Sequence, residues 1–391
     1  MRGSSVEIEI GIGKSGRRSY GFDDIAIVPS RRTRDPDDVD ISWEVDAFRF
    51  ELPLLASAMD GVVSPRSATE IGRLGGLAVL NLEGLQTRYD DPDSVLDEIA
   101  ELPDERATLR MQEIYSEPIK EELIHKRIRE IKDAGYTAAA SLTPQKVERY
   151  HKLALEAELD ILVIQGTVVS AEHVSTRTEP LNLKRFIANY DLPVFVGGCA
   201  SYSTALHLMR TGAVGVLVGV GPGAACTTRG VLGVGVPQAT AIADAAGARI
   251  RHLDETGRYC HVIADGGMRT GGDIAKAIAC GADAVMIGSP LAAAVEAPGR
   301  GYHWGMATFH PTLPRGARVK TRTLGTLEEI LAGPARENDG RLNLFGALRT
   351  SLATCGYANI KEFQKAEVMV APALQTEGKS LQRAQNVGMG R

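Results

Sequence analysis

The chain has 391 residues, a formal net charge of −5 and five cysteines, and 44% of its residues are hydrophobic. This composition supplies a sizeable core, and the length allows one large α/β barrel or two ordinary domains. The slightly acidic balance without basic runs argues against nucleic-acid binding, and no run of eighteen uncharged apolar residues predicts a membrane span. An odd number of cysteines without a C-x-x-C pair argues against a disulfide framework or a zinc site. Together with an N-terminus that lacks a signal-peptide core, it favours a reducing, cytoplasmic location.

Short apolar or β-branched runs that end in small or polar residues recur along the chain. They predict eight strands, at Leu52–Ala56, Gly76–Asn81, Thr137–Leu142, Asp160–Gln165, Pro193–Gly197, Val214–Gly219, His261–Gly266 and Asp283–Ser289. Most are followed by segments with helical spacing, at Lys120–Ala134, Pro144–Ala157, Ser203–Thr211, Gln238–Ala246 and Gly272–Cys280. Such alternation predicts a parallel sheet covered by helices, and eight units predict a (β/α)₈ TIM barrel. A doubly wound open sheet is the alternative, but no G-x-G-x-x-G follows an early strand.

The remaining segments complete a single domain over residues 1–391. Glu83–Asp133 is long for a barrel connection, charged and helical in pattern, and shows no second core. Tyr302–Arg322 is rich in Pro, Gly and Arg, which predicts a mobile flap after the eighth strand, at residues 302–322. Thr326–Leu331 and Leu342–Lys365 close the barrel, and the polar tail from Ala371 is expected to wrap around the chain or to pair with a neighbour.

Chemically useful residues follow the predicted strands, and the active sites of such barrels lie at the C-terminal strand ends. Asp265-Gly266-Gly267 follows the seventh strand and Gly288-Ser289 the eighth, where barrels commonly bind phosphate. Glycines let backbone N–H groups approach phosphate oxygens, and a serine hydroxyl adds a donor. The Asp265 carboxylate suits a ribose diol, because it accepts hydrogen bonds from both hydroxyls. Tight turns without a ligand are the alternative.

Cys226 lies in the glycine-rich loop GVGPGAACTTRG after the sixth strand. A thiol becomes a nucleophile where its surroundings favour the thiolate, and Arg229 with Thr227 and Thr228 lies nearby in the sequence. The other cysteines are expected to be small buried hydrophobes; they are Cys199, Cys260, Cys280 and Cys355. Among the basic flap residues one or two are expected to reach the site as a lid and the rest to be solvated; they are His303, His310, Arg315, Arg318, Lys320 and Arg322.

Three motifs resemble the IMP dehydrogenase/GMP reductase family over about Tyr20–Glu367: GVGPGAACTTRGVLGVGVPQATAIAD, VIADGGMRTGGDIAKAIACGADAVMIGSPLA, and FDDIAIVPS followed by LASAMDGV. The resemblance implies a (β/α)₈ barrel, a homotetramer or octamer, and a cysteine that attacks C2 of a purine nucleotide. In the dehydrogenase, a hydride passes from IMP to NAD⁺ and the thioimidate is hydrolysed to XMP. In the reductase, GMP loses ammonia and NADPH reduces the thioimidate to IMP.

The resemblance also implies roles for individual residues. Cys226 matches the nucleophile, Thr228 matches the threonine that helps to activate the small molecule, and Arg315 is our candidate for activating water, with Arg318 and His310 behind it. The matches to substrate-binding positions are Ser57, Met59, Asp265, Gly266, Gly267, Gly288, Ser289, His303, Gly305 and Met306. The family's NAD or NADP site is matched by Gln165, Thr167 and Gly219. The backbone carbonyls that hold K⁺ in the family are matched by those of Gly221, Gly223 and Cys226.

The chain departs from the family pattern mainly on the cofactor side. Glu83–Asp133 is too short for the usual pair of CBS modules, and Gln165-Gly166-Thr167 stands where an aspartate and serines are usual. Further replacements are Cys199 for an asparagine, Leu217 for an arginine, Ala224 for a serine, His303 for a tyrosine and Arg315 for a Glu or Gln. The Arg-Tyr pair that activates water in dehydrogenases has no clear counterpart.

The motifs are therefore similar to those of a divergent, CBS-lacking group of IMP dehydrogenase-like proteins. NAD-dependent oxidation of IMP to XMP in guanine nucleotide biosynthesis is the function that this resemblance implies first. GMP reductase remains open, although the glutamate that a reductase pairs with its threonine is not evident beside Thr228. A catalytically silent relative that binds a purine nucleotide is the third reading, and a reactive thiol argues against it.

Overall fold

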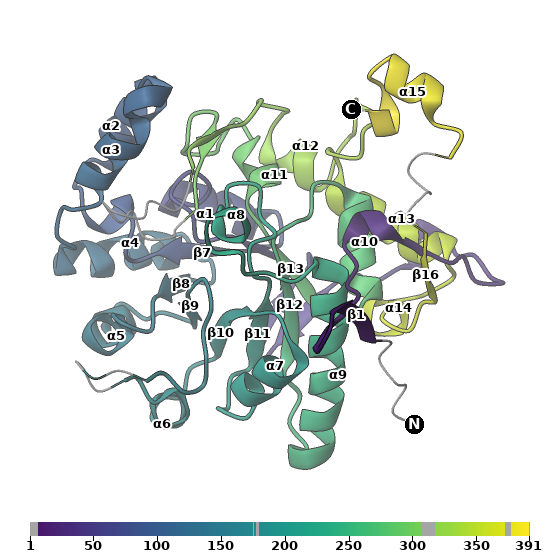
Figure 1. The fold of residues 1–391 in the computed structure, drawn as a ribbon. Helices are drawn as coiled ribbons and strands as arrows, with labels where there is room; N and C mark the ends of the chain where they lie inside the picture. Colours follow the sequence, from purple (N-terminus) through teal and green to yellow (C-terminus); the bar gives the residue numbers. More distant parts are fainter. Residues whose placement is uncertain (1–6, 175, 177–179, 306–316, 372–376, 391) are drawn as a thin grey trace.

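Eight parallel strands form a closed barrel at the centre of the computed structural model, which describes residues 7–174, 176, 180–305, 317–371 and 377–390 (Figure 1). The barrel strands are β6 (Leu54–Ala56), β7 (Leu77–Asn81), β8 (Ala139–Leu142), β9 (Ile161–Gln165), β10 (Val194–Cys199), β11 (Gly215–Val218), β12 (His261–Asp265) and β13 (Ala284–Ile287). The barrel closes where Val285 of β13 pairs with Leu54 of β6. All eight predicted strands and the TIM-barrel topology are confirmed, because strands buried on both faces are recognisable as continuous apolar runs.

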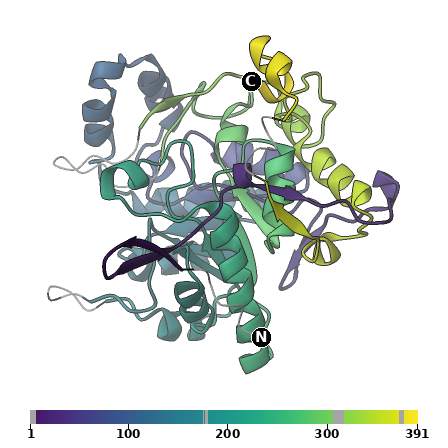
Figure 2. The same ribbon diagram turned by 45° about the vertical axis from the view of Figure 1, so that its right-hand side comes forward.

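Helices surround this barrel on all sides (Figures 1 and 2). They are α1 (Pro65–Arg73), α4 (Glu121–Asp133), α5 (Val147–Glu156), α6 (Leu183–Ala188), α7 (Tyr202–Met209), α8 (Thr228–Leu232), α9 (Gln238–Thr256), α10 (Gly271–Ala279), α11 (Ser289–Ala292), α12 (Leu327–Leu331), α13 (Leu344–Thr354) and α14 (Ile360–Phe363). Several begin at a side-chain cap: Ser64 accepts from the Ser67 amide at α1, and Thr270 accepts from the Asp273 amide at α10. The predicted helix Gln238–Ala246 is ten residues too short at its C-terminal end. In the structure α9 continues to Thr256 and is capped by Gly257 in a left-handed conformation.

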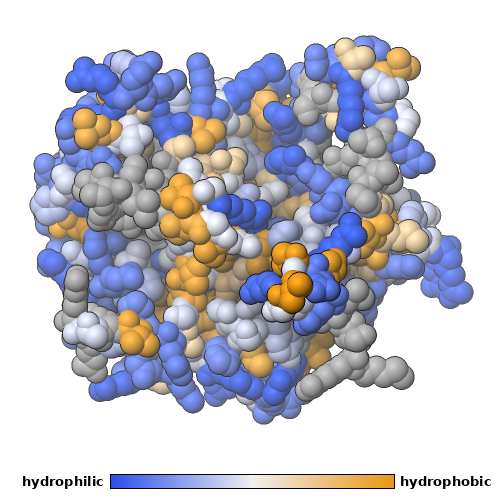
Figure 3. All heavy atoms as spheres, viewed as in Figure 1, coloured by the Kyte–Doolittle hydropathy of each residue, from blue (hydrophilic) through white to orange (hydrophobic). Residues whose placement is uncertain are grey.

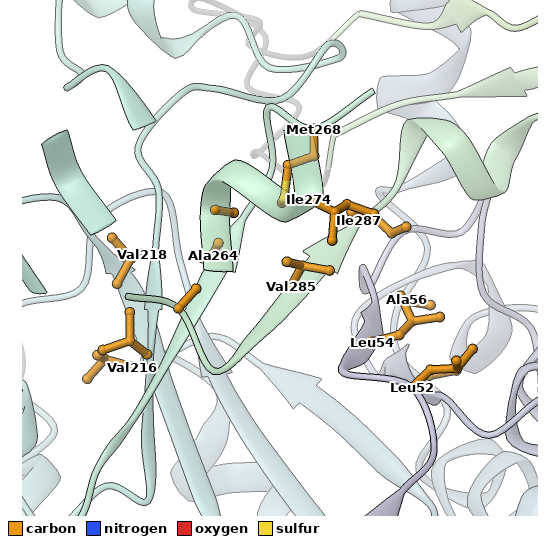
Figure 4. Packing of buried hydrophobic residues seen from close by; sticks show 14 of the residues in the cluster. Leu52, Leu54, Ala56, Val216, Val218, Ala264, Met268, Ile274, Val285 and Ile287 are labelled. Carbon is orange, nitrogen blue, oxygen red and sulfur yellow. The ribbon is translucent and has the colours of Figure 1, made fainter. Parts of the chain in front are cut away.

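Side chains alternate between two sides of the barrel wall. Leu55, Val163 and Phe195 fill the interior, which Trp43 closes at one end. Trp43 belongs to a hairpin of β4 (Trp43–Val45) and β5 (Phe48–Phe50). The alternate residues face the helices in the larger core cluster. Figure 4 shows this outer layer, with Ile287 on β13 beside Ile274 of α10.

A buried ion network fixes the start of β13 at the end of the barrel opposite the strand C-termini. Asp283 is fully buried and accepts from Arg249 at 2.8 Å, from the Tyr259 hydroxyl at 2.6 Å and from Lys361 at 2.5 Å. Burial opposes the charge, but Arg249 and Lys361 together hold the pKa of Asp283 below its usual value. These contacts join β13 to α9 and α14.

The Glu83–Asp133 connection carries a helical hairpin of α2 (Pro92–Glu101) and α3 (Asp104–Ile114), preceded by the 3₁₀ turn η3 (Leu85–Thr87). The hairpin projects beyond the ring of barrel helices (Figures 1 and 2). It encloses a small cluster of its own, formed by Leu85, Leu96, Ile99, Met111, Ile114 and Trp304. The sequence analysis missed this cluster because its largest member comes from about 190 residues further along the chain.

Shorter elements frame the barrel. The ribbon of β14 (Tyr302–His303) and β15 (Val319–Lys320) encloses residues 306–316, which lie outside the described residues. The remaining elements are β1 (Glu7–Gly11), β2 (Lys14–Arg17), η1 (Phe22–Asp24), β3 (Ile25–Ile27), η2 (Pro36–Asp38), β16 (Val368–Val370), α15 (Ser380–Ala384) and η4 (Gly388–Gly390). β16, just before the predicted tail, pairs with β3, and the amide of Ala371, the first tail residue, donates to the Asp24 carbonyl at 2.7 Å. Among the described residues, no helix has the length and apolarity to cross a membrane.

Candidate active site

Cys226 lies at the C-terminal mouth of the barrel, in the loop between β11 and α8. Its thiol donates to the Thr228 hydroxyl at 3.2 Å, and the Thr228 side chain is buried. The side chain of Cys226 is only partly buried, whereas Cys199, Cys260 and Cys355 are buried. Cys280 was also predicted to be buried and is only partly so, but burial still raises its pKa to about 12. Burial raises the pKa of Cys199 to about 12, so that thiol stays protonated and inert. Cys226 is therefore partly open to solvent and hydrogen bonded to a hydroxyl, a setting compatible with the predicted nucleophile.

Arg229 braces the Cys226 loop. Its Nε donates to the Val220 carbonyl at 3.2 Å and its Nη2 donates to the Val236 carbonyl at 2.6 Å, which joins the two ends of the loop. Burial lowers the pKa of Arg229, and the nearby Cys226 opposes that shift.

The Asp265 turn packs directly against the cysteine loop. A Cβ atom on Gly219 would lie 2.1 Å from the Asp265 carbonyl, so only glycine fits there. Gln238 holds the two strand ends together, because its amide donates to the carbonyls of Val218 at 2.7 Å and Asp265 at 3.0 Å. The sequence analysis did not identify Gln238, because its bridging role depends on two strands that are neighbours in the barrel but far apart in the sequence. The link keeps Cys226 and Asp265 on neighbouring loops.

The Asp265 side chain has one partner among the described residues, the Gln165 amide, whose Nε2 donates to Oδ2 at 3.2 Å. Burial raises the pKa of Asp265 to about 7, and the Gln165 bond opposes the shift. Gly266 and Gly267 follow in left-handed conformations, at φ values of +81° and +83°. The turn thus presents a carboxylate with spare acceptor capacity, and the structure brings Gln165 to the residue expected to bind ribose.

A second group of predicted substrate residues gathers where β13 meets β6. The Ser57 amide donates to the Ile287 carbonyl at 2.9 Å, and a Cβ atom on Gly288 would lie 2.7 Å from the Met59 sulfur. Ser289 follows, and its hydroxyl shares a 2.8 Å hydrogen bond with His303 Nε2.

His303 is almost completely buried behind Ser289. Its other ring nitrogen, Nδ1, shares a 2.6 Å hydrogen bond with the Thr321 hydroxyl. Burial lowers the pKa of His303, so the neutral ring is favoured. Both ring nitrogens already have hydroxyl partners, so the ring orients the Ser289 hydroxyl instead of presenting a free nitrogen at the mouth.

The flap residues divide between the barrel mouth and the helical hairpin. Gly305 lies beside the cysteine loop, since a Cβ atom there would be 3.6 Å from the Ala225 carbonyl. Arg318 is buried against the hairpin, where it donates to the Ile99 carbonyl and to Asp104, both at 2.5 Å. That contact removes Arg318 from the candidates for activating water. Met306, His310 and Arg315 lie outside the described residues.

Thr167 follows β9 and is partly buried, near the same end of the barrel. Gly221 and Gly223 lie in the cysteine loop, and the Cys226 amide donates to the Gly223 carbonyl at 3.0 Å. Two of the residues predicted to hold K⁺, Gly223 and Cys226, are therefore joined in one turn, and Gly221 comes two residues earlier. No cluster of His, Cys, Asp or Glu side chains suited to a metal ion occurs in the part of the chain that the structure describes.

Comparison with known proteins agrees with this geometry. Residues 19–310 match the sequence pattern of the IMP dehydrogenase / GMP reductase domain. An uncharacterized oxidoreductase of Mycolicibacterium smegmatis is 49% identical over 373 residues, which cover 93% of this chain and 99% of that protein. The inosine-5′-monophosphate dehydrogenase of Methanocaldococcus jannaschii is 27% identical over 490 aligned residues, covering 92% and 94%. The crystal structure of an IMP dehydrogenase/GMP reductase-like protein from Corynebacterium glutamicum superposes with a TM-score of 0.89 at 47% identity, covering 93% and 97%.

Proposed function

The chain belongs to the IMP dehydrogenase/GMP reductase family, and from this premise we propose that it oxidises IMP to XMP with NAD⁺ as the hydride acceptor. One observation carries the proposal: the Cys226–Thr228 pair, the Asp265 turn and Ser289 lie around one barrel mouth. A ribonucleotide monophosphate needs a diol acceptor and phosphate donors, and its oxidation at C2 needs a nucleophile beside the ring. The reaction would supply XMP for guanine nucleotide biosynthesis.

Cys226 begins the proposed reaction. Its thiol would lose its proton to solvent, and the sulfur would bond to C2 of the hypoxanthine ring as the electrons of the C2–N3 double bond move to N3. Their return would release the C2 hydrogen as a hydride, for which bound NAD⁺ would supply the acceptor. Water then adds to C2 of the resulting thioimidate, the C–S bond breaks, and XMP and the thiol are released. The Thr228 hydroxyl, 3.2 Å from the sulfur, is in place to hold the attacking water or to return the proton. Arg315 stays a prediction for the water-activating group.

The nucleotide is proposed to lie across the two last strand ends. Asp265 accepts from the ribose hydroxyls, the amides of Gly266 and Gly267 face the sugar and phosphate, and Ser289 donates to the phosphate. His303 supports Ser289 from behind through their 2.8 Å bond. Ser57, Met59, Gly288, Gly305 and Met306 are proposed to line the purine and phosphate.

NAD is proposed to approach from the β9–β11 side, along Gln165, Thr167 and Gly219. The Gln165 amide is already engaged with Asp265, which supports a shared boundary between the ribose and the cofactor. K⁺ suits the turn of Gly221, Gly223 and Cys226, because its preferred ligands are backbone carbonyls and a carbonyl that accepts one hydrogen bond keeps a second lone pair. The ion would stiffen the loop that carries the nucleophile.

We also propose that the protein assembles as a homotetramer or octamer. Its surface exposes Ile8, Ile10 and Ile12 on and beside β1, and Val231 and Leu232 on α8. Figure 3 shows hydrophobic side chains at the surface over the N-terminal hairpin. Light scattering of the purified protein determines the state of association.

Two parallel assays of the purified protein in K⁺ buffer test the proposed activity. Formation of NADH with IMP and NAD⁺ supports the dehydrogenase. Consumption of NADPH with GMP would instead identify a reductase, and no change in either assay with intact IMP binding would identify a silent nucleotide-binding relative. Among the described residues, no acidic side chain is hydrogen bonded to Thr228, which favours the dehydrogenase outcome.

A further inference from the structure

Asp60 is a fully buried carboxylate directly after Met59, at the C-terminal end of β6. Its Oδ2 accepts from the Tyr115 hydroxyl at 2.5 Å. Burial raises the pKa of Asp60 to about 6, and Tyr115, the Leu85 amide and Arg88 oppose that shift. A Cβ atom on Gly84 would lie 2.1 Å from Oδ1, so the carboxylate is pressed against that backbone. Asp60 therefore contacts the loop after β7 and the end of α3.

Tyr115 joins Asp60 to a second loop of the site. It caps the C-terminus of α3, and its hydroxyl accepts from the Trp304 indole N–H at 2.7 Å. An indole N–H only donates and an ionised carboxylate only accepts, so the hydrogen bonds run in one direction from Trp304 through Tyr115 to Asp60. Burial and the Asp60 charge hold the pKa of Tyr115 well above its usual value, so the phenol keeps its proton.

Both ends of this chain adjoin the barrel mouth. Met59, next to Asp60, contacts the Gly288 turn. Gly305, next to Trp304, lies against the Ala225 carbonyl, one residue before Cys226. Trp304 itself is fully buried in the cluster of the α2–α3 hairpin, so its position determines where Gly305 lies.

A buried carboxylate without an ion pair is costly, and an apolar cluster at this place would be stable without it. We propose that Tyr115 is a positioning residue, which clamps the Asp60 loop to the Trp304 segment and so sets the place of the cysteine loop relative to the nucleotide site. The α2–α3 hairpin thereby contributes to the active site without touching the substrate. The consequence for turnover rests on the proposed function; the consequence for Cys226 does not.

Tyr115→Phe tests the proposal, because it removes one hydroxyl and keeps the ring. Tyr89→Phe is the matched control, because the Tyr89 hydroxyl donates to the Ile114 carbonyl at 2.9 Å in the same cluster instead of to Asp60. Thermal unfolding of both variants establishes that they fold. The rate of Cys226 alkylation by iodoacetamide, followed by peptide mass spectrometry, then reports the geometry of the cysteine loop without any nucleotide.

We expect Tyr115→Phe to change the alkylation rate of Cys226 by about threefold or more and to lower kcat/KM for IMP by roughly tenfold or more, as small misplacements near reacting groups do. Tyr89→Phe should leave both values within the error of the wild type. Equal effects of the two variants, or an unchanged alkylation rate in folded Tyr115→Phe, would overturn the positioning role. If the wild type oxidises no IMP but the alkylation rates differ as expected, the proposed function fails and the positioning role stands.

Discussion

Replacement of Asp265 by Asn should stabilise the ligand-free protein at high pH and weaken its affinity for ribonucleotides. Burial raises the pKa of Asp265 to about 7, whereas an aspartate in an unfolded chain titrates at about 3.9. The folded chain therefore binds this proton more tightly. Between about pH 4 and pH 7 the unfolded chain has released the proton and the folded chain has not, so the free energy of unfolding falls as the pH rises.

The size of this effect follows from the shift. A difference of about three pKa units corresponds to at most about 4 kcal/mol. The side chain is partly open to solvent at the barrel mouth, which reduces the expected penalty to about 1–3 kcal/mol. Asn has the same shape, can still accept from Gln165 and carries no charge. The variant should therefore regain this free energy at pH 8 and gain almost nothing at pH 4.

Thermal unfolding of the ligand-free protein between pH 4 and pH 8 measures the stability change, with Asp254→Asn on the exposed face of α9 as the control. Calorimetric titration with IMP and with its 2′-deoxy analogue measures binding. Because hydrogen bonds to a charged acceptor contribute about 1.5–3 kcal/mol each, we expect IMP to bind roughly a hundredfold more weakly, with little preference left over the deoxy analogue. A variant that is less stable than the wild type at pH 8, or that binds IMP equally well, refutes the reasoning.

Two further substitutions test the framework that holds the site. Gly219→Ala should abolish IMP oxidation, because the new Cβ would lie 2.1 Å from the Asp265 carbonyl and force the cysteine loop away. Gly230→Ala is the control: its Cβ would have no atom within 4 Å, so this variant should retain full activity in the same NADH assay. Asp283→Asn should lower the free energy of unfolding in urea by about 3–5 kcal/mol, because it leaves the buried Arg249 guanidinium without its carboxylate partner. Asp244→Asn breaks an exposed ion pair and should cost less than about 1 kcal/mol; equal losses would show that the buried network is not stabilising.

The barrel could be predicted from the sequence because each of its strands is buried on both faces. Runs such as DILVIQ and DAVMIGS carry no polar alternation, and each ends at a small or polar residue that marks the strand end. Those strand ends converge by topology alone, so Cys226 and Asp265 could be assigned to one mouth before any coordinates. The positions of Gln238 and Trp304 could not, because each depends on a contact between segments that no local pattern links.

The chemistry of individual side chains was harder to predict than their location. His303 was expected beside the phosphate, which stays a prediction; in the structure both of its ring nitrogens are bonded to hydroxyls, those of Ser289 and Thr321. Arg318 was expected near the reacting groups, and its guanidinium is instead held by the α2–α3 hairpin. In both cases the residue type correctly indicated a polar, hydrogen-bonding side chain, but the hydrogen-bond partner came from an element far away in the sequence. Partner choice depends on packing, which a single sequence does not display.

The central claim is that the Cys226 sulfur becomes covalently bonded to the purine. Acid quenching of the enzyme within one turnover with IMP and NAD⁺, followed by proteolysis and mass spectrometry, tests it directly. We predict a purine nucleotide attached to the peptide that contains Cys226, and Cys226→Ala that binds IMP but forms neither the adduct nor NADH. Turnover of IMP by Cys226→Ala at the wild-type rate, or an adduct on another residue, would contradict the account.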